Sequence, residues 1–104
     1  MPVLGDPDHA DVISSLKNRV PKILRLGEPD APRAIVVVTA HWQERQPTIS
    51  SGKSHSLYYD YGGFPPEAYE LQYPAPGHPE VAQEVKKVLD EAGFNATLDE
   101  KRGA

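Results

Sequence analysis

Histidines are the side chains of this sequence with the clearest potential for chemistry, and 104 residues contain four of them. They are His9, His41, His55 and His78, and their spacing matches no compact zinc motif. The chain has no cysteine, which excludes a disulfide framework, a thiolate nucleophile and a thiolate metal ligand. Any metal site must therefore be built from histidine, aspartate or glutamate.

His41 is the histidine whose position is most informative. It directly follows residues 34–40, where four consecutive β-branched aliphatic residues predict a central strand buried on both faces. In open α/β sheets, ligand sites gather beyond the carboxyl ends of the strands, so His41 is expected to face a crevice there. Trp42 beside it could exclude solvent. Two interpretations stay open: a ligand or catalytic group, or a histidine that hydrogen-bonds a loop carbonyl.

The other three histidines are expected to have structural or solvated positions. His55 lies in a turn rich in serine, lysine and glycine, where a solvated side chain is expected. His78 precedes Pro79 and is expected at the N-cap of a helix. His9 is expected where another helix begins.

The elements that must position these residues alternate between helix and strand. Residues 8–26 have an apolar stripe at helical spacing, interrupted at Pro21, which lacks a backbone N–H. A short strand is predicted near 48–51, and the best helix over 79–92, with Val81, Val85, Val88 and Leu89 on its packed face. A further strand should begin within 94–98. This order predicts an α/β fold with a partial, mostly parallel or mixed sheet flanked by helices.

Residues 52–78 form a long connection rich in tyrosine, proline and glycine, which we call the Tyr-rich loop. Long ordered loops are often binding loops, while the alternative is a surface loop fixed by its aromatic side chains. We expect 58–77 to be ordered, with Tyr59, Phe64 and Tyr69 packed back on the domain, since aromatic side chains bury much apolar area.

Composition excludes several classes of function. The net charge of −4 argues against nucleic-acid binding, which needs clustered lysine and arginine. No stretch approaches the roughly 20 apolar residues of a membrane span, and the N-terminus does not have the pattern of a signal peptide. The expectation is a cytoplasmic protein without a membrane partner.

Three segments carry a resemblance to a known family. They are Ile-Val-Val-Val-Thr-Ala-His-Trp at 35–42, Tyr-Asp-Tyr-Gly-Gly-Phe-Pro-Pro-Glu at 59–67 and Tyr-Glu-Leu-Gln-Tyr-Pro-Ala-Pro-Gly at 69–77. Together they resemble the class III extradiol ring-cleavage dioxygenases, in the branch of the DOPA extradiol dioxygenases. The resemblance implies a metal-dependent oxidoreductase with non-haem Fe(II) or Zn(II) that inserts O2 into a catechol-type aromatic substrate. In that family His41 matches a metal ligand.

The sequence also departs from the family pattern at both ends. The first strand is expected to be cut short at residues 1–4, without the family's Ser-His-Gly ligand motif, and the chain stops at the Arg-Gly that precedes an Asp-His-Gly segment. The expectation is one partial domain, 1–104, the N-terminal portion of a larger α/β domain. With one ligand, the chain alone should bind metal weakly and be inactive. The alternative is a non-catalytic remnant that binds a protein partner through an exposed sheet edge and the Tyr-rich loop.

Overall fold

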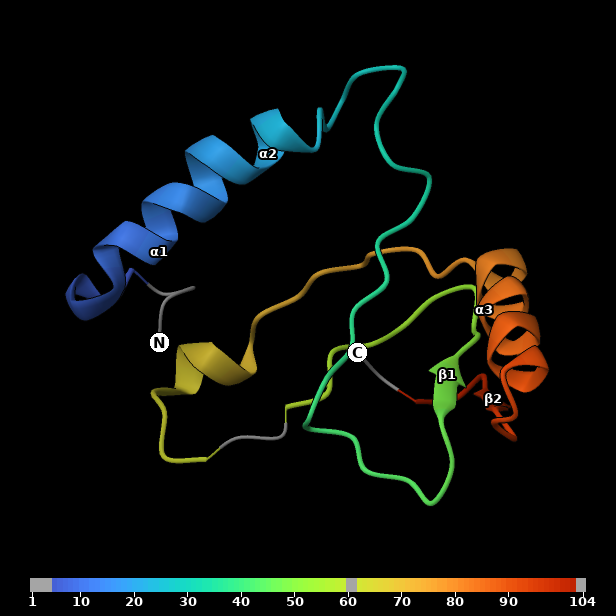
Figure 1. Cartoon of the computed structure of the whole chain (residues 1–104). Coiled ribbons are helices and arrows are strands. Elements are labelled where there is room, and N and C mark those ends of the chain that lie inside the picture. The colour runs from blue at the N-terminus through green and yellow to red at the C-terminus, as the bar shows by residue number, and fades with distance from the viewer. Residues whose placement is uncertain (1–4, 60–61, 103–104) are drawn as a thin grey trace. The chain divides into compact units, whose positions relative to one another are not determined.

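The computed structural model describes residues 5–59 and 62–102 (Figure 1). The shortened strand expected at 1–4 and two residues of the Tyr-rich loop, 60–61, lie outside this description. The chain forms two compact units, Met1–Val36 and Val37–Ala104, which are described separately. The helices and strands are α1 (Ala10–Ser14), α2 (Val20–Ile23), β1 (Thr48–Ser50), α3 (Pro79–Glu91) and β2 (Thr97–Asp99), with 3-10 turns at Pro7–His9 and Pro66–Tyr69.

Residues 7–23 of the first unit are helical, in agreement with the range 8–26 that the apolar stripe predicted except at its two ends. Asp6 caps its start by accepting a hydrogen bond from the backbone N–H of Asp8 at 2.9 Å. A π-helical turn, Ser15–Arg19, joins α1 to α2, and the N–H of Val20 donates to the carbonyl of Ser15. Pro21 follows at once and has no N–H for the regular α-helical pattern, which explains why the helix changes its winding there.

The central strand predicted for residues 34–40 is wrong. Among the residues that the structure describes, the segment has no strand partner, and its aliphatic side chains are exposed, from 63% at Ile35 to 94% at Val38. A strand exists only where a neighbour completes its backbone hydrogen bonds. Within 5–59 and 62–102, β1 and β2 pair with each other and neither pairs with this run. High β-propensity is therefore not enough to place it in a sheet.

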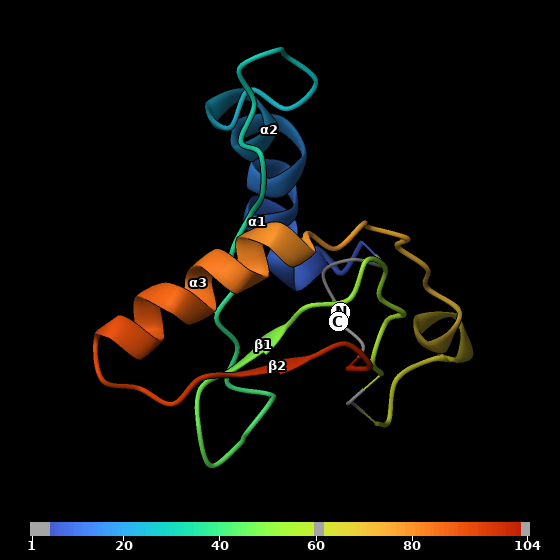
Figure 2. The same ribbon diagram turned by 90° about the vertical axis from the view of Figure 1, so that its right-hand side faces the viewer.

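The second unit contains the parallel sheet. β1 and β2 pair in parallel with Thr48 opposite Thr97 and Ser50 opposite Asp99, and α3 connects them in sequence. The N–H of Ser51 donates to the carbonyl of Asp99 at 2.9 Å and continues the ladder. Figure 2 shows the two strands side by side with α3 beside them, and α3 contacts both strands. The predicted short strand near 48–51 and the α/β fold class are confirmed.

Helix α3 begins at the predicted residue, Pro79, and ends at Glu91, one residue before the predicted end. The Nδ1 of His78 accepts a hydrogen bond from the N–H of Val81 at 3.3 Å, which makes His78 the N-cap. Gly93 ends the helix with a φ of 94°, a left-handed conformation that glycine adopts without strain.

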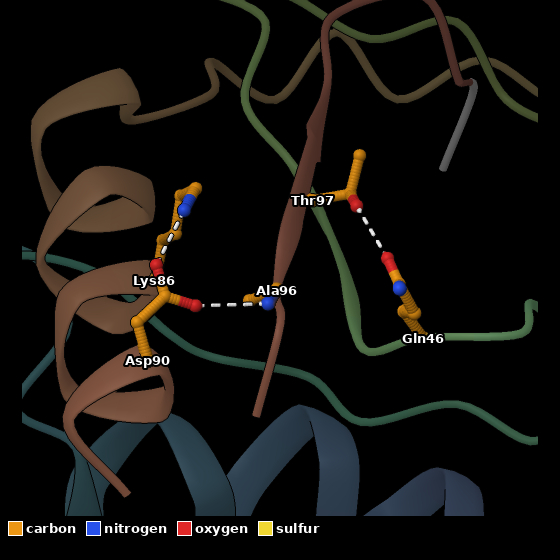
Figure 3. Close-up of polar contacts among 5 residues, drawn as sticks. All are labelled: Gln46, Lys86, Asp90, Ala96 and Thr97. Atoms are coloured by element: carbon orange, nitrogen blue, oxygen red, sulfur yellow. Dashed lines mark hydrogen bonds and ion pairs between the residues drawn. The ribbon is translucent and has the colours of Figure 1, made fainter. Parts of the chain in front are cut away.

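The turn from α3 to β2 is held by Asp90 (Figure 3). Its carboxylate accepts a hydrogen bond from the backbone N–H of Ala96 at 2.9 Å and forms an ion pair with Lys86 one helical turn earlier. The Lys86 ammonium, and then the Ala96 N–H, hold the pKa of Asp90 below its ordinary value. Beyond the turn, Thr97 Oγ1 donates to Gln46 Oε1 at 3.4 Å (Figure 3).

Small residues form the core of the described structure. Its buried apolar side chains are Ala68, Ala82 and Ala96, at most 7% exposed. The predicted packing face of α3 is partly wrong, because Val88 is 64% exposed. Val81, Val85 and Leu89 are half-buried, as are the residues of β1 that the helix contacts.

The Tyr-rich loop is closed at its base. Ser54 and Pro76 form an antiparallel bridge, and the N–H of Gly77 donates to the carbonyl of Lys53 at 2.8 Å. Farther along the loop, the Tyr59 hydroxyl donates to the carbonyl of Leu71. The loop therefore has defined internal contacts over its described residues.

Aromatic packing in this loop is confirmed only in part. The rings of Tyr59 and Tyr69 lie 6.3 Å apart between centres in a tilted pair, and Ala68 is fully buried. Tyr59, Phe64 and Tyr69 nevertheless remain 38–40% exposed. The predicted packing of these three side chains on the domain is therefore incomplete.

Candidate functional site

His41 lies on an exposed, irregular segment of the second unit. Its backbone N–H donates to Thr39 Oγ1 at 3.1 Å, which forms a local turn. The expectation that His41 lies at the carboxyl end of a strand is wrong, because 34–40 forms no strand. Its assignment as a metal ligand stays a prediction.

Trp42, the residue after His41, contacts one carboxylate and one guanidinium side chain. Trp42 is half-buried, and its indole Nε1 donates to Glu44 Oε1 at 2.9 Å. The guanidinium carbon of Arg102 lies 5.3 Å from the Trp42 ring centre and 3.8 Å from that of Tyr58. These are cation–π distances. The structure thus brings together the segment after His41, the start of the Tyr-rich loop and the residues after β2.

Arg102 is a residue that sequence reasoning missed. Nothing in the local pattern distinguishes it from the other arginines, because the two rings that its guanidinium contacts belong to residues at least 44 positions earlier in the chain. The one available signal was its place directly after a predicted strand, beyond which ligand sites of α/β proteins gather.

The other histidines have partners of their own. His55 was expected to be solvated, and this is wrong: it is half-buried, with Nδ1 3.3 Å from Ser50 Oγ. His78 uses Nδ1 as the N-cap of α3, as predicted. His9 belongs to the first unit, at the start of the helix as predicted, with Nδ1 3.3 Å from a carboxylate oxygen of Asp6.

A close backbone approach lies next to His55. A methyl group on Gly77 would overlap the carbonyl oxygen of Gly52 and come within 2.6 Å of His55 Nε2. A methyl group on Gly52 would come within 2.8 Å of the carbonyl oxygen of Glu100. Two glycines at this crossing therefore allow the base of the loop to lie directly against the end of the sheet.

Shallow open grooves run beside the sheet rather than around His41. One is lined by residues 42–48 and the other by 44–46, Thr48 and residues 97–99 of β2. Their walls are mostly polar, and no histidine lines either groove. The groove lined by residues 42–48 includes Trp42, the residue after His41, and both grooves are open to solvent.

A complete metal site cannot be built from the described residues. Within 5–59 and 62–102, no three histidine, aspartate or glutamate side chains gather closely enough to hold a metal ion. Zinc and comparable sites use at least about three protein ligands, so the donors found here do not fit a complete centre.

No helix in the described part of the chain is long and apolar enough to cross a membrane.

Comparisons with known proteins agree on one family. Residues 2–103 match the family described as the catalytic LigB subunit of aromatic ring-opening dioxygenase. The chain is 50% identical over 105 residues to "Dioxygenase tasH" of Hapsidospora irregularis, covering 99% of this chain and 32% of that protein.

Two further relatives are each called "4,5-DOPA dioxygenase extradiol". The one from Portulaca grandiflora is 41% identical over 76 residues, covering 72% of this chain and 28% of that protein. The one from Escherichia coli (strain K12) is 41% identical over 70 residues, covering 67% and 25%. The chain therefore spans a third or less of the length of these relatives.

Proposed function

Because this chain belongs to the family of catalytic LigB subunits of aromatic ring-opening dioxygenases, we propose that it forms part of an extradiol dioxygenase. The activity is that of an oxidoreductase that opens a catechol-type aromatic ring with O2. The observation that carries the proposal is the match over residues 2–103, supported by relatives named as dioxygenases.

His41 is the residue of this chain that we assign to the metal. Imidazole suits both Fe(II) and Zn(II). His41 is exposed and lies beside Trp42, whose ring is fixed by two contacts. The remaining ligands come from outside the described residues, because those residues hold no group of three donors. The 104-residue chain alone therefore binds Fe(II) or Zn(II) weakly and does not open a catechol ring.

The Tyr-rich loop is the segment that we assign to the aromatic substrate. Tyr58, the first tyrosine of this loop, and Trp42 both contact the guanidinium of Arg102. Its exposed aromatic side chains can stack against a catechol-type ring and limit access of water. O2 is the second substrate.

A chimera tests this function directly. Residues 1–104 replace the aligned part of the Hapsidospora irregularis relative, whose match covers 99% of this chain, and ring opening of catechol-type compounds and metal content are measured. The chimera is expected to purify with metal and to open the ring, while His41→Ala reduces activity to background. His9→Ala is the matched control, because the His9 imidazole pairs with Asp6 at the start of a helix and its removal should leave activity intact.

Two results would contradict the proposal. One is a folded chimera that binds metal but keeps its activity when His41 is replaced. The other is a 104-residue chain that holds one metal ion per chain or opens a catechol ring by itself.

A second candidate function is a protein-binding module without catalysis. The observation that favours it is the exposed aliphatic run 35–38, whose side chains are 63–94% exposed. Exposed apolar runs often mark interaction surfaces. A chimera that is folded and supplied with metal but inactive would favour this function over the first.

A further inference from the structure

Arg102 connects two segments that are far apart in the sequence. Its guanidinium carbon lies 3.8 Å from the ring centre of Tyr58 and 5.3 Å from that of Trp42. Tyr58 is the first tyrosine of the Tyr-rich loop, and Trp42 follows His41 directly. We call the group Trp42, Tyr58 and Arg102 the Arg102 clasp.

The clasp is anchored to the sheet through Asp99. The Oδ1 atom of Asp99, the last residue of β2, accepts hydrogen bonds from the N–H groups of Lys101 at 2.8 Å and Arg102 at 3.0 Å. Asp99 is itself paired with Ser50 of β1. The backbone of Arg102 therefore has a fixed position relative to both strands.

The backbone pairing of the segment that carries His41 lies at its far end, where the carbonyl of Pro47 accepts a hydrogen bond from the N–H of Thr97 at 2.9 Å. Residues 34–47 contain no helix or strand. Trp42 is held by the guanidinium of Arg102 and by the carboxylate of Glu44, which accepts its indole N–H at 2.9 Å. The contacts of Trp42 therefore add to the hydrogen bond from the His41 N–H to Thr39 Oγ1 in holding this irregular segment.

We propose that Arg102 is a positioning residue that fixes the direction of His41 by clasping Trp42 against Tyr58. The path runs from β2 through Asp99 and Arg102 to Trp42, and the peptide bond passes the constraint to His41. That this constraint would orient a metal ligand rests on the proposed function of His41. The contacts of Arg102 with Trp42 and Tyr58 do not depend on that function.

The test uses the 104-residue chain and NMR. The single tryptophan gives one indole N–H signal, and the four histidines give separate imidazole Cε1–H signals. Arg102→Met should shift and broaden the signals of Trp42 and His41, and leave those of His55 and His78 in place. Losing both cation–π contacts should also raise acrylamide quenching of Trp42 by about twofold to fivefold.

Two further variants separate positioning from general stability. Arg102→Lys keeps a cation over the rings and should restore the His41 signal most of the way. Arg45→Met removes a similar exposed charge near Trp42 in sequence and should change neither signal.

Three outcomes overturn the proposal. Trp42 signals that do not respond to Arg102→Met show that the clasp does not form. A response of Trp42 without one of His41 shows that the constraint ends at Trp42. Shifts of His55 and His78 as large as those of His41 assign Arg102 to overall folding. None of these readouts requires metal or activity, so failure of the proposed function is detected separately, by the chimera.

Discussion

Replacing Gly77 by alanine should destabilise the second unit by about 2–3 kcal/mol. The added methyl group would overlap the carbonyl oxygen of Gly52 and lie 2.6 Å from His55 Nε2, so backbone must move. Overpacking of this kind costs about 1–3 kcal/mol. The displaced backbone also weakens the hydrogen bond from Gly77 to the carbonyl of Lys53, worth about 1 kcal/mol. The lower entropy of the unfolded alanine chain offsets about 0.5 kcal/mol of this loss.

Urea unfolding followed by far-UV circular dichroism and by Trp42 emission measures this change. Gly62→Ala is the matched control, because a methyl group there meets nothing within 4 Å and the residue has no positive φ. It should be neutral or stabilise by up to about 0.5 kcal/mol. Equal unfolding midpoints for the two variants would refute the close approach of Gly77 to Gly52.

Three further predictions concern the helices. The pKa of Asp90 is lowered, mainly by Lys86. The Asp90 carboxylate therefore stabilises the fold above the ordinary carboxyl pKa, and this stabilisation is lost as the pH falls through the lowered pKa. An acid titration of helicity should show the loss in the wild-type chain and not in Asp90→Asn. Ala82→Asp should lower the free energy of unfolding by at least about 2 kcal/mol more than Val88→Asp, because the first site is 5% exposed and the second 64%; urea midpoints that coincide would contradict this. Pro21→Ala supplies the missing N–H, so far-UV circular dichroism should show more helix; an unchanged spectrum would mean that the π-helical turn has another cause.

Elements defined by nearby residues could be predicted from the sequence. The bounds of α3 depend on Pro79, Gly93 and an apolar stripe, all within one segment, and the N-cap role of His78 follows from its place before Pro79. The interruption at Pro21 is likewise a property of one residue. The α/β fold class followed from the order of such segments.

Features that depend on distant residues could not be predicted in the same way. The run 34–40 has strong β-propensity, but pairing is a property of two segments, and the sequence does not show which neighbour is present. His55 looked solvated because its local composition is polar, whereas its burial comes from the crossing of Gly52 and Gly77. The contact of Arg102 with Trp42 joins residues near opposite ends of the second unit.

The alanine core has a consequence for the heat capacity of unfolding. Ala68, Ala82 and Ala96 each bring a single methyl group out of water, while the aliphatic run 35–38 stays in it. Exposure of apolar surface is what makes the heat capacity rise on unfolding, so this chain should have a small rise for its length and a broad, flat dependence of stability on temperature. Any surface that comes to cover the run 35–38 will remove apolar area from water. Calorimetry should then record its binding as a negative change in heat capacity, whatever the sign of the enthalpy.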